Sequence, residues 1–159
     1  MQPDSHGLTV LPFWSGERAP GWATDARGVI DGLTAETNPI HILRAAMESI
    51  CYRFALIGRA LDLFTSEASI ILTGKTFLSY PVWAQMMADV LFRQVELFPA
   101  AEVSVRGAAL LALETIGTID SIELMKSEAG RIFLPDINRR EIYARAIERQ
   151  QQLYQRLIT

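Results

Sequence analysis

Two glycine turns are the features of this sequence that have a physical reason to bind a ligand. Gly74 follows the apolar run of residues 69–73, and Gly32 closes a short strand predicted over residues 28–34. Ligands of open α/β sheets collect at the carboxyl ends of strands, where a glycine lets the backbone approach a ligand closely. A helix is expected beyond each turn, and a helix N-terminus favours anionic groups. A plain turn is the alternative interpretation at both positions.

The histidines and the cysteine lack the spacing that metal binding or nucleophilic catalysis needs. His6 lies near the first residue and His41 in the first turn of a predicted helix, and neither has a cysteine or carboxylate at ligand spacing. We therefore expect no metal site and a structural role for His41. Cys51 falls within the apolar stretch of the same helix, so we expect it to pack rather than react. A single cysteine cannot form an internal disulfide, which fits a reducing cytoplasm.

Composition places the chain among single-domain globular proteins. Its 159 residues are 50% hydrophobic and 21% charged, with a net charge of −3. These values exclude disorder, and no apolar stretch approaches the roughly 20 residues that cross a bilayer. Basic and acidic residues are spread almost evenly, so we expect neither nucleic acid nor a membrane as a partner. Only Lys75 and Lys126 among the 15 basic residues are lysines.

The first half of the chain predicts two short strands and one long helix. Residues 7–13 form the first strand, and an aperiodic loop over residues 15–28 leads to the second. Asn38 is suited to cap a helix that begins at Pro39. Apolar residues then recur every three or four positions and predict the buried face of that helix. They are Leu43, Met47, Ile50, Phe54, Ile57, Leu61 and Phe64, and the polar face is expected to carry mainly His41, Arg44, Glu48, Arg53 and Arg59.

The second half predicts strands that alternate with helices, which favours an α/β layered sheet. Residues 69–73 are typical of a central strand covered on both faces, and residues 94–98 of a half-buried strand. Small residues in a helix over 105–113 would let it approach a sheet or another helix closely. A helix is expected from Pro81, with Val82, Met86 and Val90 on its buried side, and Gly117 is expected to end the helix over 105–113. A short helix over residues 119–125 and an extended piece over residues 131–134 should follow. The last predicted helix is capped by Asn138 and carries the apolar residues Ile142, Ala146, Leu153 and Leu157.

Several motifs resemble those of the FGGY carbohydrate kinases. The most specific are LPFWSGERAP at residues 11–20 and DARGVIDGLT at residues 25–34, where the family pattern runs LPFxSGERAPxWxxxARGxxxGLT. Further matches are His41-Ile42, Ala45-Ala46-Met47-Glu48, Leu72-Thr73-Gly74, residues 83–91 and residues 102–110. The resemblance covers residues 7 to about 117 in the family's order, and gluconate kinases and xylulose kinases are the subfamilies that the chain resembles most.

The resemblance implies an α/β fold, an actin-like, ribonuclease H-like ATPase lobe with a mixed sheet and packed helices. Residues 1–159 would form a single domain, the later part of the second lobe, truncated on its N-terminal side. In the family the Asp-x-Gly-Thr phosphate loop, most sugar contacts and the general-base Asp lie in the first lobe, which is absent here. We therefore expect the nucleotide-side lobe of an ATP-dependent sugar or sugar-acid kinase, without catalytic residues of its own and inactive without the missing lobe.

The resemblance also implies the partners of this lobe. They are the missing first lobe, a sugar or sugar-acid substrate, and ATP with Mg²⁺. An interlobe face without its partner leaves apolar surface exposed, which is compatible with a homo-oligomer.

By resemblance, five residues contribute to an adenosine pocket. Gly32 and Glu36 would flank the nucleotide. Gly74 and Lys75 stand where the family has a Gly-Gly pair, and Ser79 is the polar residue four positions beyond that pair. All five are therefore expected cofactor-binding residues.

The loop after Gly74 departs from the family pattern in two ways. Lys75 replaces a glycine at a position meant for close backbone approach, and Tyr80 looks like an extra residue before Pro81. Either Lys75 turns toward the phosphates as a point charge, or the nucleotide site is weakened. The second alternative corresponds to a degenerate, non-catalytic module used for binding or assembly.

Overall fold

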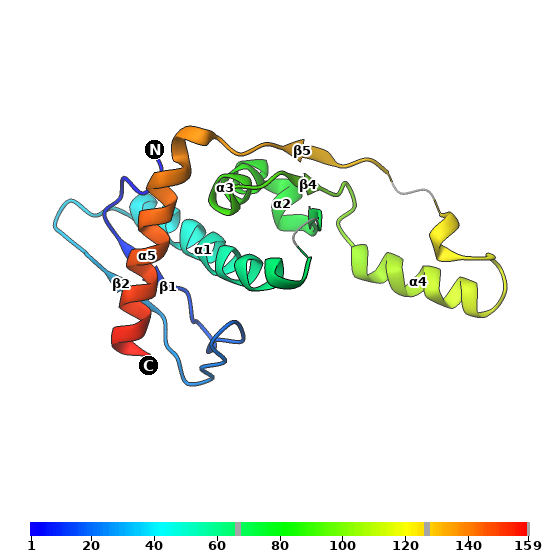
Figure 1. Cartoon of the computed structure of the whole chain (residues 1–159), viewed down its shortest axis with the longest axis horizontal. Helices are drawn as coiled ribbons and strands as arrows, with labels where there is room; N and C mark the ends of the chain where they lie inside the picture. Colours follow the sequence, from blue (N-terminus) through cyan, green and yellow to red (C-terminus); the bar gives the residue numbers. More distant parts are fainter. Residues whose placement is uncertain (66–67, 126–127, 159) are drawn as a thin grey trace.

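The computed structural model describes residues 1–65, 68–125 and 128–158, which form two small sheets and the helices around them (Figure 1). Lys126 lies outside the described residues. The elements are β1 (Thr9–Leu11), β2 (Val29–Asp31), α1 (Pro39–Thr65), β3 (Ile70–Leu72), α2 (Lys75–Ser79), α3 (Pro81–Leu91), β4 (Val95–Leu97), α4 (Val103–Thr115), η1 (Ile122–Leu124), β5 (Arg131–Phe133), η2 (Ile137–Arg139) and α5 (Arg140–Leu157).

The strands confirm the predicted mixed sheet but divide it into two parts. β1 pairs antiparallel with β2, whereas β4 lies between β3, its parallel partner, and β5, its antiparallel partner. β3 is thus an edge strand, and Ile71 is 53% exposed. The prediction that this strand is central and covered on both faces is wrong for the described residues, because only β4 pairs with it.

α1 runs through the middle of the molecule and buries the face opposite to the predicted one. Its buried residues include Ala45, Glu48, Ser49 and Tyr52, whereas Phe54 is 48% exposed. The helix packs against α3, α5 and β1. Small side chains on the buried face allow these elements to approach closely, and the buried polar groups are hydrogen-bonded there.

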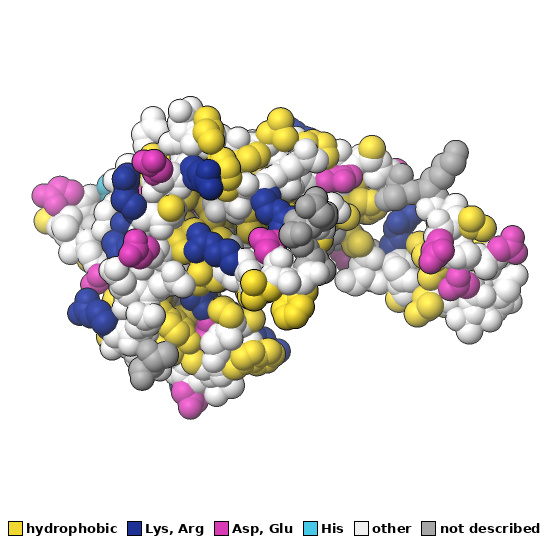
Figure 2. Space-filling view, viewed as in Figure 1, with side chains coloured by type: hydrophobic (Ala, Val, Ile, Leu, Met, Phe, Trp, Pro, Cys, Tyr) yellow, Lys and Arg dark blue, Asp and Glu magenta, His cyan; other side chains and the backbone are white. Residues whose placement is uncertain are grey.

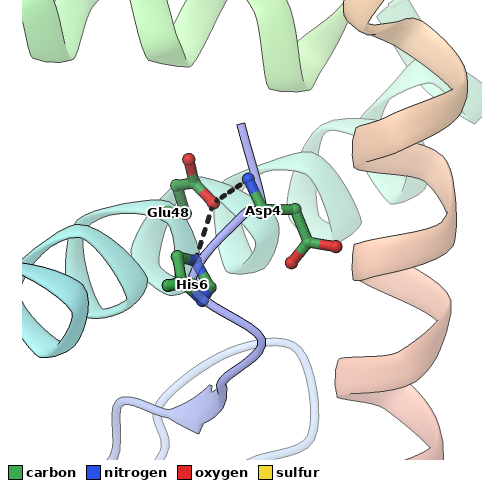
Figure 3. Close-up of side chains that lie close together, drawn as sticks. All are labelled: Asp4, His6 and Glu48. Atoms are coloured by element: carbon green, nitrogen blue, oxygen red, sulfur yellow. Dashed lines mark hydrogen bonds and ion pairs between the residues drawn. The ribbon is translucent and has the colours of Figure 1, made fainter. Parts of the chain in front are cut away.

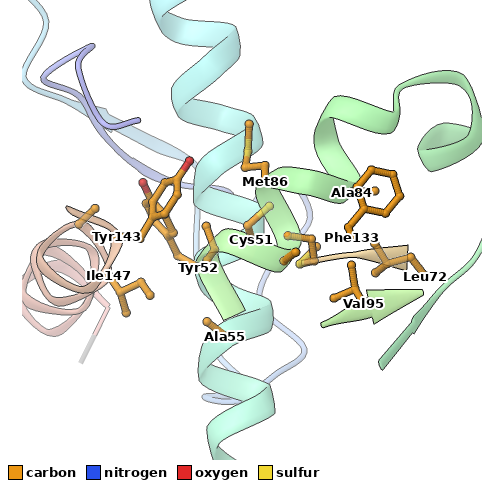
Figure 4. Close-up of a cluster of buried hydrophobic side chains, with 14 of the residues drawn as sticks. Cys51, Tyr52, Ala55, Leu72, Ala84, Met86, Val95, Phe133, Tyr143 and Ile147 are labelled. Atoms are coloured by element: carbon orange, nitrogen blue, oxygen red, sulfur yellow. The ribbon is translucent and has the colours of Figure 1, made fainter. Parts of the chain in front are cut away.

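The largest group of buried hydrophobic residues lies between α1, α3, α5 and the second sheet (Figure 4). It includes Cys51, Met87, Val95 and Tyr143. The expected packing role of Cys51 is confirmed, since its side chain is fully buried and burial raises the pKa of the thiol to about 12. A thiol with such a pKa stays protonated and unreactive at neutral pH.

The segment between β3 and α3 contains a helix that the sequence analysis placed in a loop. Lys75 begins the short helix α2, and Tyr80 separates it from α3, which starts at Pro81 as predicted. α3 buries Met86 and Val90, but Val82 is 61% exposed. The prediction for Val82 is wrong because the core contacts of α3 lie on the side that carries Ala84 and Ala88.

α4 extends away from the rest of the described chain (Figure 1). None of its residues is buried, and its main neighbour is η1. The close packing that its small residues would allow is therefore not made within the described part of the chain. Gly117, with φ +73, ends this segment as expected. The predicted helix over residues 119–125 is reduced to the short turn η1.

α5 is preceded by a cap that differs from the predicted one. The Asp136 side chain accepts a hydrogen bond from the backbone N–H of Asn138 and starts η2, and α5 follows from Arg140. Asn138 is not the cap because Asp136 precedes it and satisfies the free N–H. Gln150 of α5 is fully buried and donates to the carbonyl oxygens of Val10 (2.8 Å) and Ser49 (3.2 Å). It thereby ties α5 to β1 and α1.

Further residues of α5 differ in burial. Ala146 and Leu153 are buried as expected, Ile142 is half-buried, and Leu157 is 53% exposed. Among the described helices, none is long and apolar enough to span a bilayer.

Candidate functional site

The turn at Gly74 joins the carboxyl end of β3 to α2. Gly74 has φ +104, a conformation that favours glycine, and a Cβ placed on it would meet no atom within 4 Å. The backbone at this turn is therefore open to an approaching group. Lys75 and Ser79 of α2 are both exposed, so Gly74, Lys75 and Ser79 lie together in one segment at the surface.

A hollow of about 650 Å³ lies at the edge of the sheet next to this turn. Its walls come from β3, β4, the beginning of α4 and residues 128–129, and Thr73, the residue before Gly74, lines it. The Arg106 guanidinium lies 6.0 Å from the centre of the Phe98 ring in its wall. Since β3 and β4 are parallel, their carboxyl ends meet at this edge. The predicted ligand position thus adjoins a hollow with polar and aromatic walls.

Gly32 and Glu36 lie after β2, in a different part of the molecule. Gly32 has φ +87, and a Cβ on it would lie 2.7 Å from the carbonyl oxygen of Gly7. This close contact explains why position 32 is a glycine, because any side chain there would collide with the neighbouring backbone. Glu36 is exposed, and a hydrogen bond from the Thr34 side chain lowers the pKa of its carboxyl group.

The structure does not bring these two groups together. Figure 1 places the loop after β2 at one end of α1, and α2 on the other side of α3. No hydrogen bond or ion pair joins Gly32 or Glu36 to Gly74, Lys75 or Ser79 within the described residues. The five predicted residues therefore form two separate groups.

A buried polar cluster centred on Glu48 is a feature that sequence reasoning missed. Glu48 accepts hydrogen bonds from Arg44 (2.5 Å), Tyr52 (3.0 Å) and Tyr143 (3.3 Å). His6 Nδ1 accepts from the backbone N–H of Leu8, so its Nε2 donates to Glu48 at 3.1 Å. Burial alone would raise the pKa of Glu48, but the hydrogen bonds from His6, Arg44 and Tyr52 and the charge of Arg44 outweigh it and lower the pKa.

Asp4, His6 and Glu48 bring oxygen and nitrogen atoms close enough to hold a metal ion (Figure 3). Their other contacts argue for a structural role instead. The Asp4 carboxylate points away from Glu48 toward α5, where Arg149 binds both of its oxygens. Both Glu48 oxygens already accept from protein groups. A metal ion would have to displace these donors, so the donor set does not fit a divalent cation well.

A second buried ion pair holds the long loop of residues 15–28 against α1 and α5. Arg53 donates to Glu17, and its guanidinium lies 5.2 Å from the ring centre of Phe13 and 5.1 Å from that of Tyr154. The Tyr154 hydroxyl also donates to Glu17, at 2.6 Å. Burial and this hydrogen bond raise the pKa of Tyr154. Arg53 was predicted on the outer face of α1 and is in fact buried.

A further cavity, of about 370 Å³, lies between α1, α3 and α5. Figure 2 shows basic side chains spread over this face of the molecule. Arg59, Arg93 and Arg140 line it, and Arg140 lies 4.4 Å from the centre of the Phe92 ring. Arg93 pairs with Asp62 at 2.6 Å. None of the five predicted residues lines this cavity.

Comparison with known sequences finds a family profile and several relatives that match this chain. The profile described as "FGGY family of carbohydrate kinases, C-terminal domain" matches residues 1–115. A gluconokinase of Bacillus subtilis is 34% identical over 134 residues, which cover 84% of this chain and 26% of that protein. A glycerol kinase of Shewanella halifaxensis is 36% identical over 138 residues, covering 84% of this chain and 28% of its own. The chain thus spans about a quarter of the length of these relatives.

Solved structures agree with the sequence matches. The xylulose kinase of Rhodospirillum rubrum superposes on 99% of this chain with a TM-score of 0.80 at 26% identity, using 31% of its own length. The Plasmodium falciparum glycerol kinase with ADP superposes on 97% of this chain with a TM-score of 0.71 at 27% identity, using 31% of its own. About two thirds of each of these proteins lies outside the superposed part.

Proposed function

The chain belongs to the FGGY family of carbohydrate kinases, and from this membership we propose that it is the nucleotide-side lobe of an ATP-dependent kinase that phosphorylates a sugar or sugar-acid hydroxyl. Its fold is the actin-like, ribonuclease H-like α/β lobe, with a mixed sheet and packed helices. The observation that carries the proposal is the open Gly74 turn at the carboxyl edge of β3 and β4, beside a hollow of about 650 Å³.

The residues at this edge fit an adenine nucleotide. No atom lies within 4 Å of the position of a Gly74 Cβ, which leaves room for a ribose or base against the backbone. The exposed Lys75 can reach outward from the same turn and bring a positive charge to a phosphate. ATP with Mg²⁺, when bound, supplies the phosphoryl group. The role of this chain is to bind and orient the nucleotide.

The remaining parts of a phosphoryl transfer reaction are assigned to polypeptide outside this chain. Transfer needs a base on the acceptor hydroxyl and donors around the phosphates on both sides of a cleft. The chain matches only 26% of the Bacillus subtilis gluconokinase. We therefore expect the isolated chain to be inactive, with a first lobe as its partner and the cytoplasm as its compartment. The relative named gluconokinase supports a sugar acid as the substrate.

A second candidate function is a non-catalytic binding or assembly module. Three observations favour it. Lys75 adds a long side chain where a glycine is expected, and the 61% exposed Tyr80 separates α2 from α3. Gly32 and Glu36 also lie apart from this turn. All three features would weaken nucleotide binding.

Titration with Mg-ATP decides between the two functions. Binding to the 159-residue protein is measured by calorimetry and compared with Gly74→Ala and Gly107→Ala. Both positions have open space around a Cβ, but only Gly74 has a positive φ and lies at the proposed site. Loss of binding by Gly74→Ala, with normal binding by Gly107→Ala, supports the nucleotide-side lobe.

The Lys75→Gly variant then identifies the role of the lysine. Weaker binding by this variant supports a phosphate contact, whereas tighter binding supports obstruction and the degenerate module. Absence of Mg-ATP binding by the unaltered protein and by Lys75→Gly would contradict the nucleotide-lobe proposal.

A further inference from the structure

We propose that the cavity between α1, α3 and α5 binds a small organic phosphate, whose phosphate group is held by Arg59 and Arg140 and whose apolar body lies on the cavity floor. The cavity shares no lining residue with the hollow beside the Gly74 turn. This ligand therefore goes beyond the proposed nucleotide-binding function.

The cavity has the size and the apolar floor of a small-molecule site. Its volume of about 370 Å³ lies within the range of roughly 300–1,000 Å³ that is usual for ligand pockets. Ala55 of α1, Val90 of α3 and Ile147 of α5 line it, and all three are buried. Transfer of an apolar group from water to such a floor is favourable. The floor therefore favours a ligand with an apolar body.

Two arginines at the mouth of the cavity carry charges that the described chain does not neutralise. Arg59 of α1 and Arg140 of α5 line the cavity and are exposed. Neither forms an ion pair with a described residue. The planar set of N–H donors on a guanidinium suits the oxygens of a phosphate or a carboxylate. A phosphate monoester, with a charge of about −1.5 to −2 at pH 7, balances both arginines, whereas a single carboxylate leaves one unbalanced.

The acidic residues that line the cavity do not cancel these two charges. Asp62 pairs with Arg93 at 2.6 Å, and Asp89 Oδ2 pairs with Arg139 at 2.8 Å. Asp89 Oδ1 accepts from the backbone N–H of Asp136 at 2.9 Å. Since each of these carboxylates has a cationic partner of its own, the charge that remains at the cavity is positive.

An unusual backbone conformation at the end of α3 holds Arg140 in place. Phe92 has φ +51 and ψ +41, a left-handed conformation that large residues rarely adopt. Its ring lines the cavity, and the Arg140 guanidinium lies 4.4 Å from the ring centre. Stacking restricts the guanidinium before any ligand binds and leaves the N–H groups at its edge free to donate. Strained residues of this kind cluster at binding sites, so the conformation of Phe92 supports a binding role for the cavity.

The test uses phenyl phosphate as the probe, because it joins a phosphate group to an apolar ring. Its binding to the 159-residue protein is measured by calorimetry at constant ionic strength and compared with that of inorganic phosphate and of benzoate. We expect phenyl phosphate to bind at least about 10-fold more tightly than either, since inorganic phosphate lacks the apolar body and benzoate has a single charge. Absence of phenyl phosphate binding, or equal affinities for all three probes, would overturn the proposal.

Substitution of the two arginines should weaken this binding selectively. We expect Arg59→Gln and Arg140→Gln each to raise the dissociation constant of phenyl phosphate at least about 10-fold. Arg145→Gln is the matched control, because Arg145 is an exposed arginine of α5 that does not line the cavity. It should change the constant less than about 2-fold. An equal loss in Arg145→Gln would indicate general attraction to the basic surface and would overturn the proposal.

A further substitution fills the cavity without changing its charge. Ala144 lines the cavity and is exposed, so a leucine at this position occupies part of the cavity while the buried floor stays in place. We expect Ala144→Leu to bind phenyl phosphate at least about 10-fold more weakly, with thermal unfolding unchanged. Normal binding by this variant would overturn the proposal. If Ala144→Leu is not recovered folded, the arginine variants decide.

The Gly74→Ala variant separates this cavity from the nucleotide turn. Gly74 does not line the cavity, so we expect Gly74→Ala to bind phenyl phosphate as the unaltered protein does. Loss of phenyl phosphate binding in Gly74→Ala, with normal binding by Arg59→Gln and Arg140→Gln, would place the phosphate at the nucleotide turn and overturn the proposal.

Discussion

Glu48 accepts hydrogen bonds from side chains of α1, from Tyr143 of α5 and from His6 near the first residue. Its carboxylate is fully buried, so its charge is stabilised entirely by these neighbours. Removing one partner of a buried ion pair leaves an uncompensated charge and is strongly destabilising. Glu48 therefore holds the first residues, the long helix and the last helix together.

Protonation of Glu48 should make the stability depend on pH. The pKa of Glu48 in the folded protein is lowered from 4.5, so its contribution is present above 4.5 and is lost as the pH falls through the lower folded pKa. We expect Glu48→Gln to cost about 3 kcal/mol at pH 7 and to flatten this acid dependence. Urea unfolding at several pH values, with the exposed Glu141→Gln as the control, measures both effects. An unchanged acid dependence in Glu48→Gln would contradict this role.

Gly32 gives a second prediction at the scale of one residue. An added Cβ would lie 2.7 Å from the Gly7 carbonyl oxygen, and the φ of +87 disfavours any other residue. We expect Gly32→Ala to lower the free energy of unfolding by about 1–3 kcal/mol. The matched substitution Gly107→Ala, in the interior of α4 with open space around it, should instead stabilise the helix by about 0.5–1 kcal/mol. Urea unfolding of both variants tests the contrast.

At the scale of elements, α1 and β3 are both more exposed to solvent than their sequences predict. Each has an apolar pattern that is typical of burial on more sides than the described chain covers. Within the described residues the two small sheets also have separate edges, because β1 pairs only with β2 and β3 only with β4. These open surfaces are explained together if further polypeptide completes the fold.

The start of α5 provides a prediction about an element boundary. The Asp136 side chain accepts from the Asn138 N–H at 3.0 Å and also pairs with Arg139 at 3.1 Å. Loss of a cap of this kind costs about 1 kcal/mol, so Asp136→Ala should destabilise the protein by that amount. Asn138→Ala removes the residue that the sequence favoured as the cap and should cost less than about 0.5 kcal/mol. Thermal unfolding of the two variants distinguishes the caps, and a larger effect at Asn138 would contradict the assignment.

At the scale of the whole molecule, packing is concentrated around α1 and is sparse at α4. Buried residues occur along α1, α3 and α5, whereas α4 has none. The stability of different regions should therefore differ, because local opening is governed by how much apolar surface a segment buries.

Hydrogen exchange should reveal this difference. We expect amides of α4 to exchange at least about 100-fold faster than those between Ala45 and Ala55 of α1, because α4 can open without disturbing the core. Mass spectrometry of the exchanged peptides measures the two rates. Equal exchange rates in the two segments would contradict this prediction.

The sequence by itself determined where most strands and helices lie, the packing role of Cys51 and the family motifs. These features depend on local patterns, such as β-branched runs, capping residues and the spacing of apolar side chains. The site residues Gly74, Lys75 and Ser79 could be placed together for the same reason, since they follow one strand. Their role in binding stays a prediction.

Only the tertiary structure decided which face of α1 is buried and which side chains meet across the chain. Helical periodicity indicates an apolar face, but small residues such as Ala45 and Ser49 pack against α3, α5 and β1, whereas the larger Leu43, Phe54 and Phe64 stay exposed. His6 and Glu48 are 42 residues apart, and Glu17 and Arg53 are 36 apart, so no local spacing predicts either pair. The physical reason is that burial of a side chain depends on neighbours from distant segments of the chain, which a local pattern does not contain.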